Sequence, residues 1–307
     1  MQDFDPKQDA RNIKLSICRP IEIDKLINII AYRSNFQRQL ILDAYKMRYD
    51  TNLIDDLKSA LNGNFQKAVI ALFYTPVDYD CYQLGESIKL FGTNRDTIIE
   101  ILATRSNVRI TDIKRRYPEI NKGKDLIKEI QNNTSGYFRD ILIKLLQCGR
   151  LNNKNPEEVE CKEYAQKLHS AEEMKKGMEQ EIFLSIFTEK SKKEFILISQ
   201  LYYKLYGKTI LETIESLFKG DVKKVFKAIT YALLSPSEYF AYRINKAIKG
   251  FMTNNNILMR ILISRDEIDI DRIKKYYKQL YNQDLYTTIN EKIDGDYRNL
   301  LLALVGQ

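Results

Sequence analysis

The stretch Ile101-Leu-Ala-Thr-Arg-Ser-Asn107 (ILATRSN) decides the fold, because three other segments of the 307-residue chain repeat its pattern. These segments are residues 29–35 (IIAYRSN), 186–192 (IFTEKSK) and 261–267 (ILISRDE). Each copy has a basic anchor, and the anchors are Arg33, Arg105, Lys190 and Arg265, separated in turn by 72, 85 and 75 residues. This period is longer than that of common two-helix solenoid units, so it predicts a small helical domain used four times.

The positions around each anchor predict amphipathic helices. Apolar residues lie seven and four positions before every anchor, and an Ile lies eight positions after it. A tyrosine lies twelve positions after each anchor, and the four are Tyr45, Tyr117, Tyr202 and Tyr277. Spacings of three, four and seven residues place side chains on one helical face, so we expect two helices around each anchor, with the tyrosines in the core. We expect the arginine anchors to bond backbone carbonyls at helix ends.

A glycine about thirty residues after each anchor marks the start of a further apolar helix. The four are Gly63, Gly136, Gly220 and Gly295, and apolar residues follow each of them at helical spacing. We expect each glycine to have a positive φ at the end of a short preceding helix. Together with the segment before each anchor, this predicts about five helices per repeat.

Composition supports a helical protein with a substantial core. The chain is 44% hydrophobic and contains only 12 Gly and 6 Pro, which favours helices. The longest interval between anchors contains residues 149–160 (GRLNNKNPEEVE), whose Asn, Gly and Pro content is typical of an exposed linker. This divides the chain into two halves of two repeats. The predicted segments are a short N-terminal tail (1–12), repeats 1 (13–75) and 2 (76–148), a linker (149–162), and repeats 3 (163–234) and 4 (235–307).

Charge and cysteine content restrict the classes of function. The net charge of +8 makes acidic partners plausible, but the basic residues are spread over all four repeats, so nucleic-acid binding is not expected. No CxxC pair, signal peptide or long apolar span is present, which favours a cytoplasmic protein with free thiols. His169 is the only histidine, and no catalytic constellation can be assembled, so we expect no enzyme activity.

Two segments of the second repeat resemble the annexin family: GTNRDTIIEILATRSN (92–107) and TSGYFRDILIKLL (134–146). The resemblance covers essentially the whole chain, and the divergent calcium loops are similar to those of the alpha-giardin branch. It implies an all-α fold of four annexin-like repeats of about five helices each, arranged as a curved disc in two halves. In the family, loops on the convex face bind calcium and acidic phospholipid.

The family's calcium site needs a K-G-x-G-T loop, whose carbonyls hold the ion, and an acid near the end of the fourth helix. Calcium prefers six to eight oxygen ligands, and a bidentate acid supplies two of them. Loss of the acid therefore removes one negative charge and two oxygens. On the pattern of this chain, Pro20 replaces the loop glycine of repeat 1, and the acid position holds Ala60, Asn133, Leu217 and Lys292 in the four repeats. No repeat keeps the complete site.

The best remaining site of the family's type would use the carbonyls of Ile88, Leu90 and Gly92 together with Asn133. We expect it to bind calcium weakly. A relocated site is the alternative, and the nearby acids are Glu22, Asp24, Glu179, Glu215, Glu291 and Asp294.

Large apolar residues stand at two of the predicted loop tips. Phe91 follows Lys89 and Leu90, and Phe251 precedes Met252, close to Lys249. Lys176 lies in the corresponding predicted loop of repeat 3. An apolar tip with a basic rim is typical of an interfacial membrane contact, in which each cation contributes ~1 kcal/mol and each buried Phe roughly 1.5–3 kcal/mol. The alternative is that the rings fold back onto their own repeat.

These observations predict a non-enzymatic protein that binds acidic phospholipid membranes peripherally, with weakened or relocated calcium binding and a link to the cytoskeleton. The competing hypothesis is a calcium-independent structural module that binds a cytoskeletal protein. Both place the chain in the cytoplasm, at the membrane or on the cytoskeleton.

Overall fold

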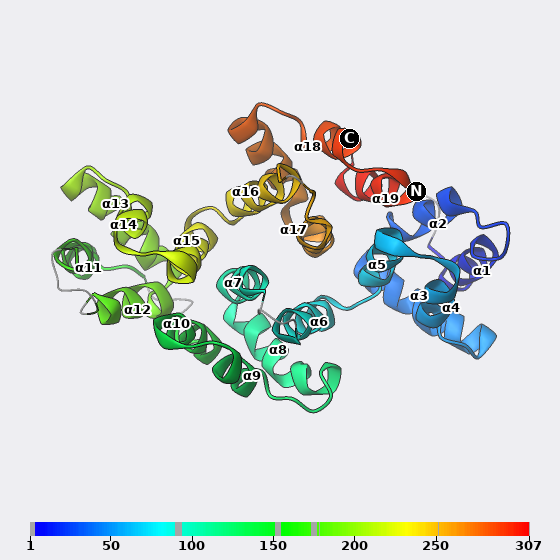
Figure 1. Ribbon diagram of the computed structural model, residues 1–307, viewed down its shortest axis with the longest axis horizontal. Helices are drawn as coiled ribbons and strands as arrows, with labels where there is room; N and C mark the ends of the chain where they lie inside the picture. Colours follow the sequence, from blue (N-terminus) through cyan, green and yellow to red (C-terminus); the bar gives the residue numbers. More distant parts are fainter. Residues whose placement is uncertain are drawn as a thin grey trace. The chain divides into compact units, whose positions relative to one another are not determined.

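The computed structural model describes residues 4–89, 94–150, 155–172, 177, 179–250 and 252–306. Within these residues the chain forms nineteen α-helices and no strand (Figure 1). The all-α prediction and the four helical repeats are therefore confirmed.

The first three repeats each contain five helices. Repeat 1 consists of α1 (Pro6–Ser16), α2 (Ile23–Ile30), α3 (Asn35–Tyr49), α4 (Leu53–Ala60) and α5 (Gly63–Leu72). Repeat 2 consists of α6 (Pro76–Lys89), α7 (Arg95–Thr104), α8 (Asn107–Ile120), α9 (Leu126–Asn133) and α10 (Gly136–Gln147). Repeat 3 consists of α11 (Glu158–Ser170), α12 (Gln180–Glu189), α13 (Lys192–Tyr206), α14 (Ile210–Leu217) and α15 (Gly220–Leu234).

In repeat 4 the second and third helices meet at a kink at Asp269 and are numbered together as α17 (Asn255–Tyr281). Repeat 4 consists of α16 (Pro236–Ile248), α17, α18 (Leu285–Lys292) and α19 (Gly295–Val305). In the other repeats a serine caps the third helix, and the three are Ser34, Ser106 and Ser191. Asp266 takes that position in repeat 4, and α17 continues past it to a non-helical residue at Asp269. The chain is kinked at Asp269, so the two helical segments of α17 correspond to the second and third helices of the other repeats.

The N-terminal tail predicted from the sequence is shorter than expected, because α1 already begins at Pro6. Asp5 accepts a hydrogen bond from the Lys7 backbone N–H at 2.9 Å, and Pro6 occupies the first turn, where its missing N–H is no disadvantage. Asp9 and Ala10 are buried. Residues 6–12 are therefore part of repeat 1.

The chain forms two compact units, each of two repeats, but the pairs are not consecutive in sequence. Residues 1–79 and 240–307 form the unit of repeats 1 and 4, and residues 80–239 form the unit of repeats 2 and 3. In the first unit α5 packs against α17 and α19, and in the second α15 packs against α7 and α10. The predicted linker therefore lies inside the second unit and does not divide the chain into halves.

The repeated pattern fills the core as predicted. The four tyrosines twelve residues after the anchors are at most 1% exposed, and the four isoleucines at the shared position, Ile41, Ile113, Ile198 and Ile273, are fully buried. The landmark glycines have φ angles of 62°, 58°, 59° and 65° in chain order. Each is the first residue of the last helix of its repeat, so the predicted positive φ is confirmed.

Replacing Gly136 by alanine is expected to destabilise the protein by ~1–2 kcal/mol, because a Cβ disfavours the left-handed conformation. Gly149→Ala is the matched control, since Gly149 has no positive φ and an added Cβ would come no closer than 3.8 Å to Glu189. Chemical denaturation of both variants measures the difference. Equal losses in the two would contradict the role given to the φ of Gly136.

The basic anchors bind side chains of their own repeats, so the expectation that the arginines bond backbone carbonyls is wrong. Arg105 donates two hydrogen bonds to Asp80, at 2.9 and 2.8 Å, and Arg33 donates to Asp9 at 2.7 Å. In both repeats the acid lies on the first helix. Lys190 Nζ lies 3.5 Å from Glu160. The anchor therefore ties the loop before the third helix to the beginning of its repeat.

Repeat 4 holds its anchor differently. Phe240 stands where the acid would lie, and the Arg265 guanidinium sits 4.6 Å from the centre of its ring. Arg265 also donates to Asp269 at 2.7 Å, one turn further along α17. A cation–π contact and a local ion pair thus replace the bond to the first helix.

The asparagine of the ILATRSN stretch makes the backbone bonds expected of the arginine. Asn107 Nδ2 donates to the carbonyl oxygens of Arg150 and Cys148 at 2.7 and 3.0 Å, beyond the end of α10. Asn35 Nδ2 donates to Tyr74 in the same way, at 2.7 Å. The stretch therefore joins the second, third and fifth helices of its repeat.

A buried charge cluster joins repeats 1 and 4 within the first unit. Arg38, 2% exposed, donates to the Ile30 carbonyl at 2.8 Å. Its guanidinium nitrogens lie 3.8 Å from Asp266 and 3.7 Å from Glu267. Burial raises the pKa of Asp266 to about 6. The nearby charge of Glu267 acts in the same direction, and the charge of Arg38 acts against it. The folded protein therefore holds a proton on Asp266 at pH values where the unfolded chain has lost it.

This raised pKa predicts a specific pH dependence. Between the unfolded pKa and about 6 the folded state binds the extra proton, so stability from this group increases as the pH falls and is lost as it rises through 6. From pH 7 to pH 5, the wild-type chain should gain about 1–1.5 kcal/mol relative to Asp266→Asn. Urea denaturation of both proteins at the two pH values measures this difference. A constant difference would contradict the raised pKa.

Candidate functional site

The first loop of a repeat, between its first and second helices, is closed by the same backbone hydrogen bond in three repeats. The backbone N–H at its end donates to a carbonyl near the end of the first helix, at 2.8 Å in each case: Glu22 to Ser16, Asn94 to Ser87 and Asn254 to Ala247. The side chains of Asn94 and Asn254 also cap the following helices. The hydrogen bond that closes the loop is thus the same in the three repeats, although their loop sequences differ.

The last loop of a repeat, between its fourth and fifth helices, lacks the acid that would complete a calcium site. Ala60, Asn133, Leu217 and Lys292 stand at that position, each at the end of the fourth helix. Asn133 Nδ2 donates to the Glu129 carbonyl at 2.8 Å, which leaves one neutral oxygen for a ligand. Ile88 is buried near the end of α6, and the other two predicted calcium ligands, Leu90 and Gly92, lie outside the described residues.

The donor set does not fit the family's complete calcium site. Among the residues that the structure describes, no group of three or more His, Cys, Asp or Glu side chains is placed to hold a metal ion. The position of the bidentate acid is neutral in three repeats and cationic in repeat 4. Calcium needs several oxygens and gains most from carboxylates, so these residues can offer at most backbone carbonyls and an amide.

The predicted membrane-contact residues fall partly within the described chain. Lys89 and Lys249 are both exposed; Lys89 pairs with Glu86 at 2.9 Å, and Lys249 lies 5.2 Å from the ring centre of Tyr281. Phe91, Lys176 and Phe251 lie outside the described residues. Met252, next to Phe251, is 80% exposed. No other large apolar side chain among the described residues is as exposed.

Two tyrosines, the part-buried Tyr137 and the buried Tyr297, donate hydrogen bonds to backbone carbonyls at the ends of these loops. Tyr137, at the start of α10, donates to the Gln180 carbonyl at 2.6 Å, and Tyr297, at the start of α19, donates to the Asn255 carbonyl at 3.2 Å. Burial raises the pKa of both phenols, so they remain neutral hydrogen-bond donors. Each bond connects the end of a first loop to the beginning of a fifth helix. The sequence pattern marked Tyr297 only as an apolar position and did not single out Tyr137.

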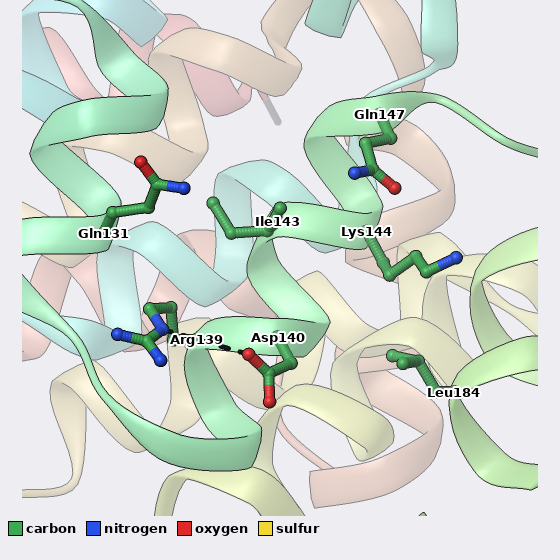
Figure 2. A pocket seen from close by; sticks show the side chains of 7 residues that line it. All are labelled: Gln131, Arg139, Asp140, Ile143, Lys144, Gln147 and Leu184. Atoms are coloured by element: carbon green, nitrogen blue, oxygen red, sulfur yellow. Dashed lines mark ion pairs between the residues drawn. The ribbon is translucent and has the colours of Figure 1, made fainter. Parts of the chain in front are cut away.

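A pocket of about 400 Å³ lies beside α10 in the second unit. Figure 2 shows Gln131 of α9 and Leu184 of α12 on either side of Arg139, Asp140, Ile143, Lys144 and Gln147 of α10. Arg139 and Asp140 are 3.8 Å apart. No histidine, cysteine or serine is among the residues that line this pocket.

Comparison with known proteins gives one consistent result. A family profile described as Annexin matches residues 20–72, 79–145, 163–229 and 239–304. Human annexin A11 is 36% identical over 305 residues, which are 99% of this chain and 60% of that protein. The chain therefore spans less than two thirds of that relative's length.

No helix in the described part of the chain is long and apolar enough to cross a membrane.

Solved structures agree with the family profile. The structure titled annexin III has a TM-score of 0.95 and 34% identity, covering 100% of this chain and 95% of that one. A calcium-bound alpha-14 giardin has a TM-score of 0.88 at 19% identity, covering 99% of this chain and 100% of that one. At this identity the giardin shows the common fold alone.

Proposed function

The chain belongs to the annexin family, and from that premise we propose that it binds acidic phospholipid membranes with weakened or relocated calcium binding. Members of this family are generally non-enzymatic proteins that bind acidic phospholipid in a calcium-dependent manner. The proposal for this chain is that apolar and basic side chains of the first loops carry much of the attachment.

The observation that supports this proposal is the exposed Met252, which follows the exposed Lys249 by three residues in the same loop. Burying such a side chain in the membrane interface contributes roughly 1.5–3 kcal/mol, and each nearby cation ~1 kcal/mol at an anionic surface. At the position of the missing acid, the exposed Lys292 adds a positive charge instead of a calcium ligand. Repeat 4 is therefore suited to direct attraction to lipid phosphate.

Cosedimentation with phosphatidylserine vesicles tests the proposal, in calcium and in chelator at two salt concentrations. We expect pelleting in chelator that weakens at the higher salt concentration, because surface charges are screened. Pelleting only with calcium would show a working calcium site and contradict weakened binding. Pelleting under neither condition would contradict the membrane proposal and favour a cytoskeletal protein partner, the role in which neither lipid nor calcium is needed.

A further inference from the structure

Asn62 and Gly63, where α5 begins, form the only asparagine–glycine pair in the chain. Asparagine is a chemically labile residue, because the backbone nitrogen of the next residue can attack its side-chain amide. A glycine in that next position has no Cβ to obstruct the approach. The pair is therefore the asparagine site of this sequence that is most open to a covalent change, provided that the fold does not protect it.

The fold leaves the side chain of Asn62 unprotected. It is exposed and makes no hydrogen bond to the first turn of α5. No other residue that the structure describes bonds to it either. By contrast, the side chain of Asn52 accepts a hydrogen bond from the Ile54 backbone N–H at 2.8 Å, at the start of α4. The amide of Asn62 is therefore free to rotate toward the backbone.

The backbone nitrogen of Gly63 is equally accessible. As the first residue of α5 it has no carbonyl within the helix to donate to, and no carbonyl elsewhere in the described chain accepts from it. Its φ is 62°, and no atom of another segment lies within 4 Å of the place where a Cβ would stand. The positive end of the helix dipole favours negative charge here, which helps this nitrogen to lose its proton.

Solvent reaches both residues. Asn62 and Gly63 line a pocket of about 410 Å³ in the unit of repeats 1 and 4, together with residues such as Asp294 of repeat 4. The backbone of Asn62 is extended, with φ −145° and ψ 172°, so it lies outside the hydrogen-bonded part of the helix. The pocket gives the side chain room to move and gives water access to the reacting atoms.

We propose that Asn62 is a site of spontaneous deamidation in the folded chain. The deprotonated Gly63 nitrogen attacks Asn62 Cγ and forms a C–N bond. The side-chain nitrogen leaves as ammonia and carries the proton that Gly63 has lost, so a five-membered imide ring remains. Water then adds to one of the two ring carbonyls and breaks its bond to the Gly63 nitrogen. The product is an aspartate or its isoaspartyl isomer, and water is the only co-reactant.

The equivalent positions of the other repeats show what the change does. Ser135 and Lys219 precede the landmark glycines of repeats 2 and 3, and neither has an amide or carboxyl group that could form the ring. Asp294 precedes Gly295 in repeat 4, with φ −123° and ψ 162°, close to the angles of Asn62. Deamidation therefore gives repeat 1 the acid that repeat 4 already has, and it lowers the net charge of +8 by one.

The test is prolonged incubation of the full-length chain at neutral pH, folded in buffer and unfolded in urea, followed by peptide mass spectrometry. We expect the peptide that contains Asn62 to acquire the mass of an acid, in the folded chain at no less than about a tenth of the unfolded rate. Asn64, half-buried and followed by Phe65, lies in the same peptide and should stay an amide. A folded rate below that tenth, or equal conversion of Asn64, would overturn the proposal.

Asn62→Ser is the matched variant, because it gives repeat 1 the residue that precedes the landmark glycine of repeat 2. Ion-exchange chromatography of the incubated wild-type chain should show a growing species with one less positive charge, and the variant should lack it. The same species in the variant would place the change at another residue and contradict the assignment. These outcomes do not depend on membrane binding, so they stand apart from the proposed function.

Discussion

Replacing Asp80 by alanine is expected to lower the free energy of unfolding by about 3–5 kcal/mol, the largest effect of any single change considered. The side chains of Arg105 and Asp80 are 8% and 4% exposed, and two hydrogen bonds join them. Burial alone would lower the pKa of Arg105, but the charge and hydrogen bonds of Asp80 raise it. Without Asp80 the guanidinium stays charged and buried without its partner. Urea denaturation followed by circular dichroism measures the loss.

Asp140→Ala is the control for this prediction. It removes an exposed aspartate 3.8 Å from an arginine in the same unit, and exposed pairs contribute only about 0–1 kcal/mol. A loss for Asp80→Ala no larger than that of the control would show that the buried pair does not hold repeat 2 together.

The second large effect concerns membrane binding. Phe91→Ala combined with Phe251→Ala is expected to weaken binding to phosphatidylserine vesicles about a hundredfold, if each ring contributes at least ~1.5 kcal/mol by burial in the interface. Met252→Ala alone should weaken it about tenfold for the same reason. Cosedimentation over a range of lipid concentrations gives the affinities.

Met47→Ala is the matched control, because Met47 is 77% exposed on α3 and lies outside the loops. It should bind vesicles as the wild-type chain does. Unchanged binding of the Phe and Met252 variants, with unchanged thermal unfolding, would show that these side chains are not membrane contacts.

The fold was predictable because its information is local and occurs four times. The tyrosines and isoleucines at fixed distances from the anchors mark helical faces, and the positive φ of Gly136 follows from its place between two apolar helices. The serine at the start of each third helix also acts locally. In repeat 4 Asp266 takes its place, and the kink between the two helical segments of α17 lies three residues further on, at Asp269.

Long-range pairings could not be predicted in the same way. Asp80 lies on a different helix from Arg105, so helical periodicity does not connect them. The pairing of repeat 1 with repeat 4 depends on contacts between the ends of the chain, such as those of α5 with α19. The beginning of α1, in contrast, was predictable from the sequence, because Asp5 and Pro6 form a recognisable helix start.

The candidate site was likewise predictable only in part from the sequence. The sequence shows which calcium ligands have been replaced, because each position is fixed relative to a glycine or an anchor. It does not show that Asn255, Lys292 and Asp294 share a pocket with the start of α5, since that pocket is built from two repeats far apart in the chain.

The most direct test of the central claim is to return one carboxylate to the chain. Asn133→Asp supplies the missing acid in repeat 2, which keeps Gly92 and Thr93, and Ala60→Asp does the same in repeat 1, where Pro20 has replaced the loop glycine. The measurement is the calcium concentration needed for half-maximal binding to phosphatidylserine vesicles. We predict that Asn133→Asp lowers it about tenfold, ~1.4 kcal/mol, while Ala60→Asp leaves it unchanged. An unchanged half-maximal calcium concentration for Asn133→Asp, or an equal decrease for Ala60→Asp, would contradict the account.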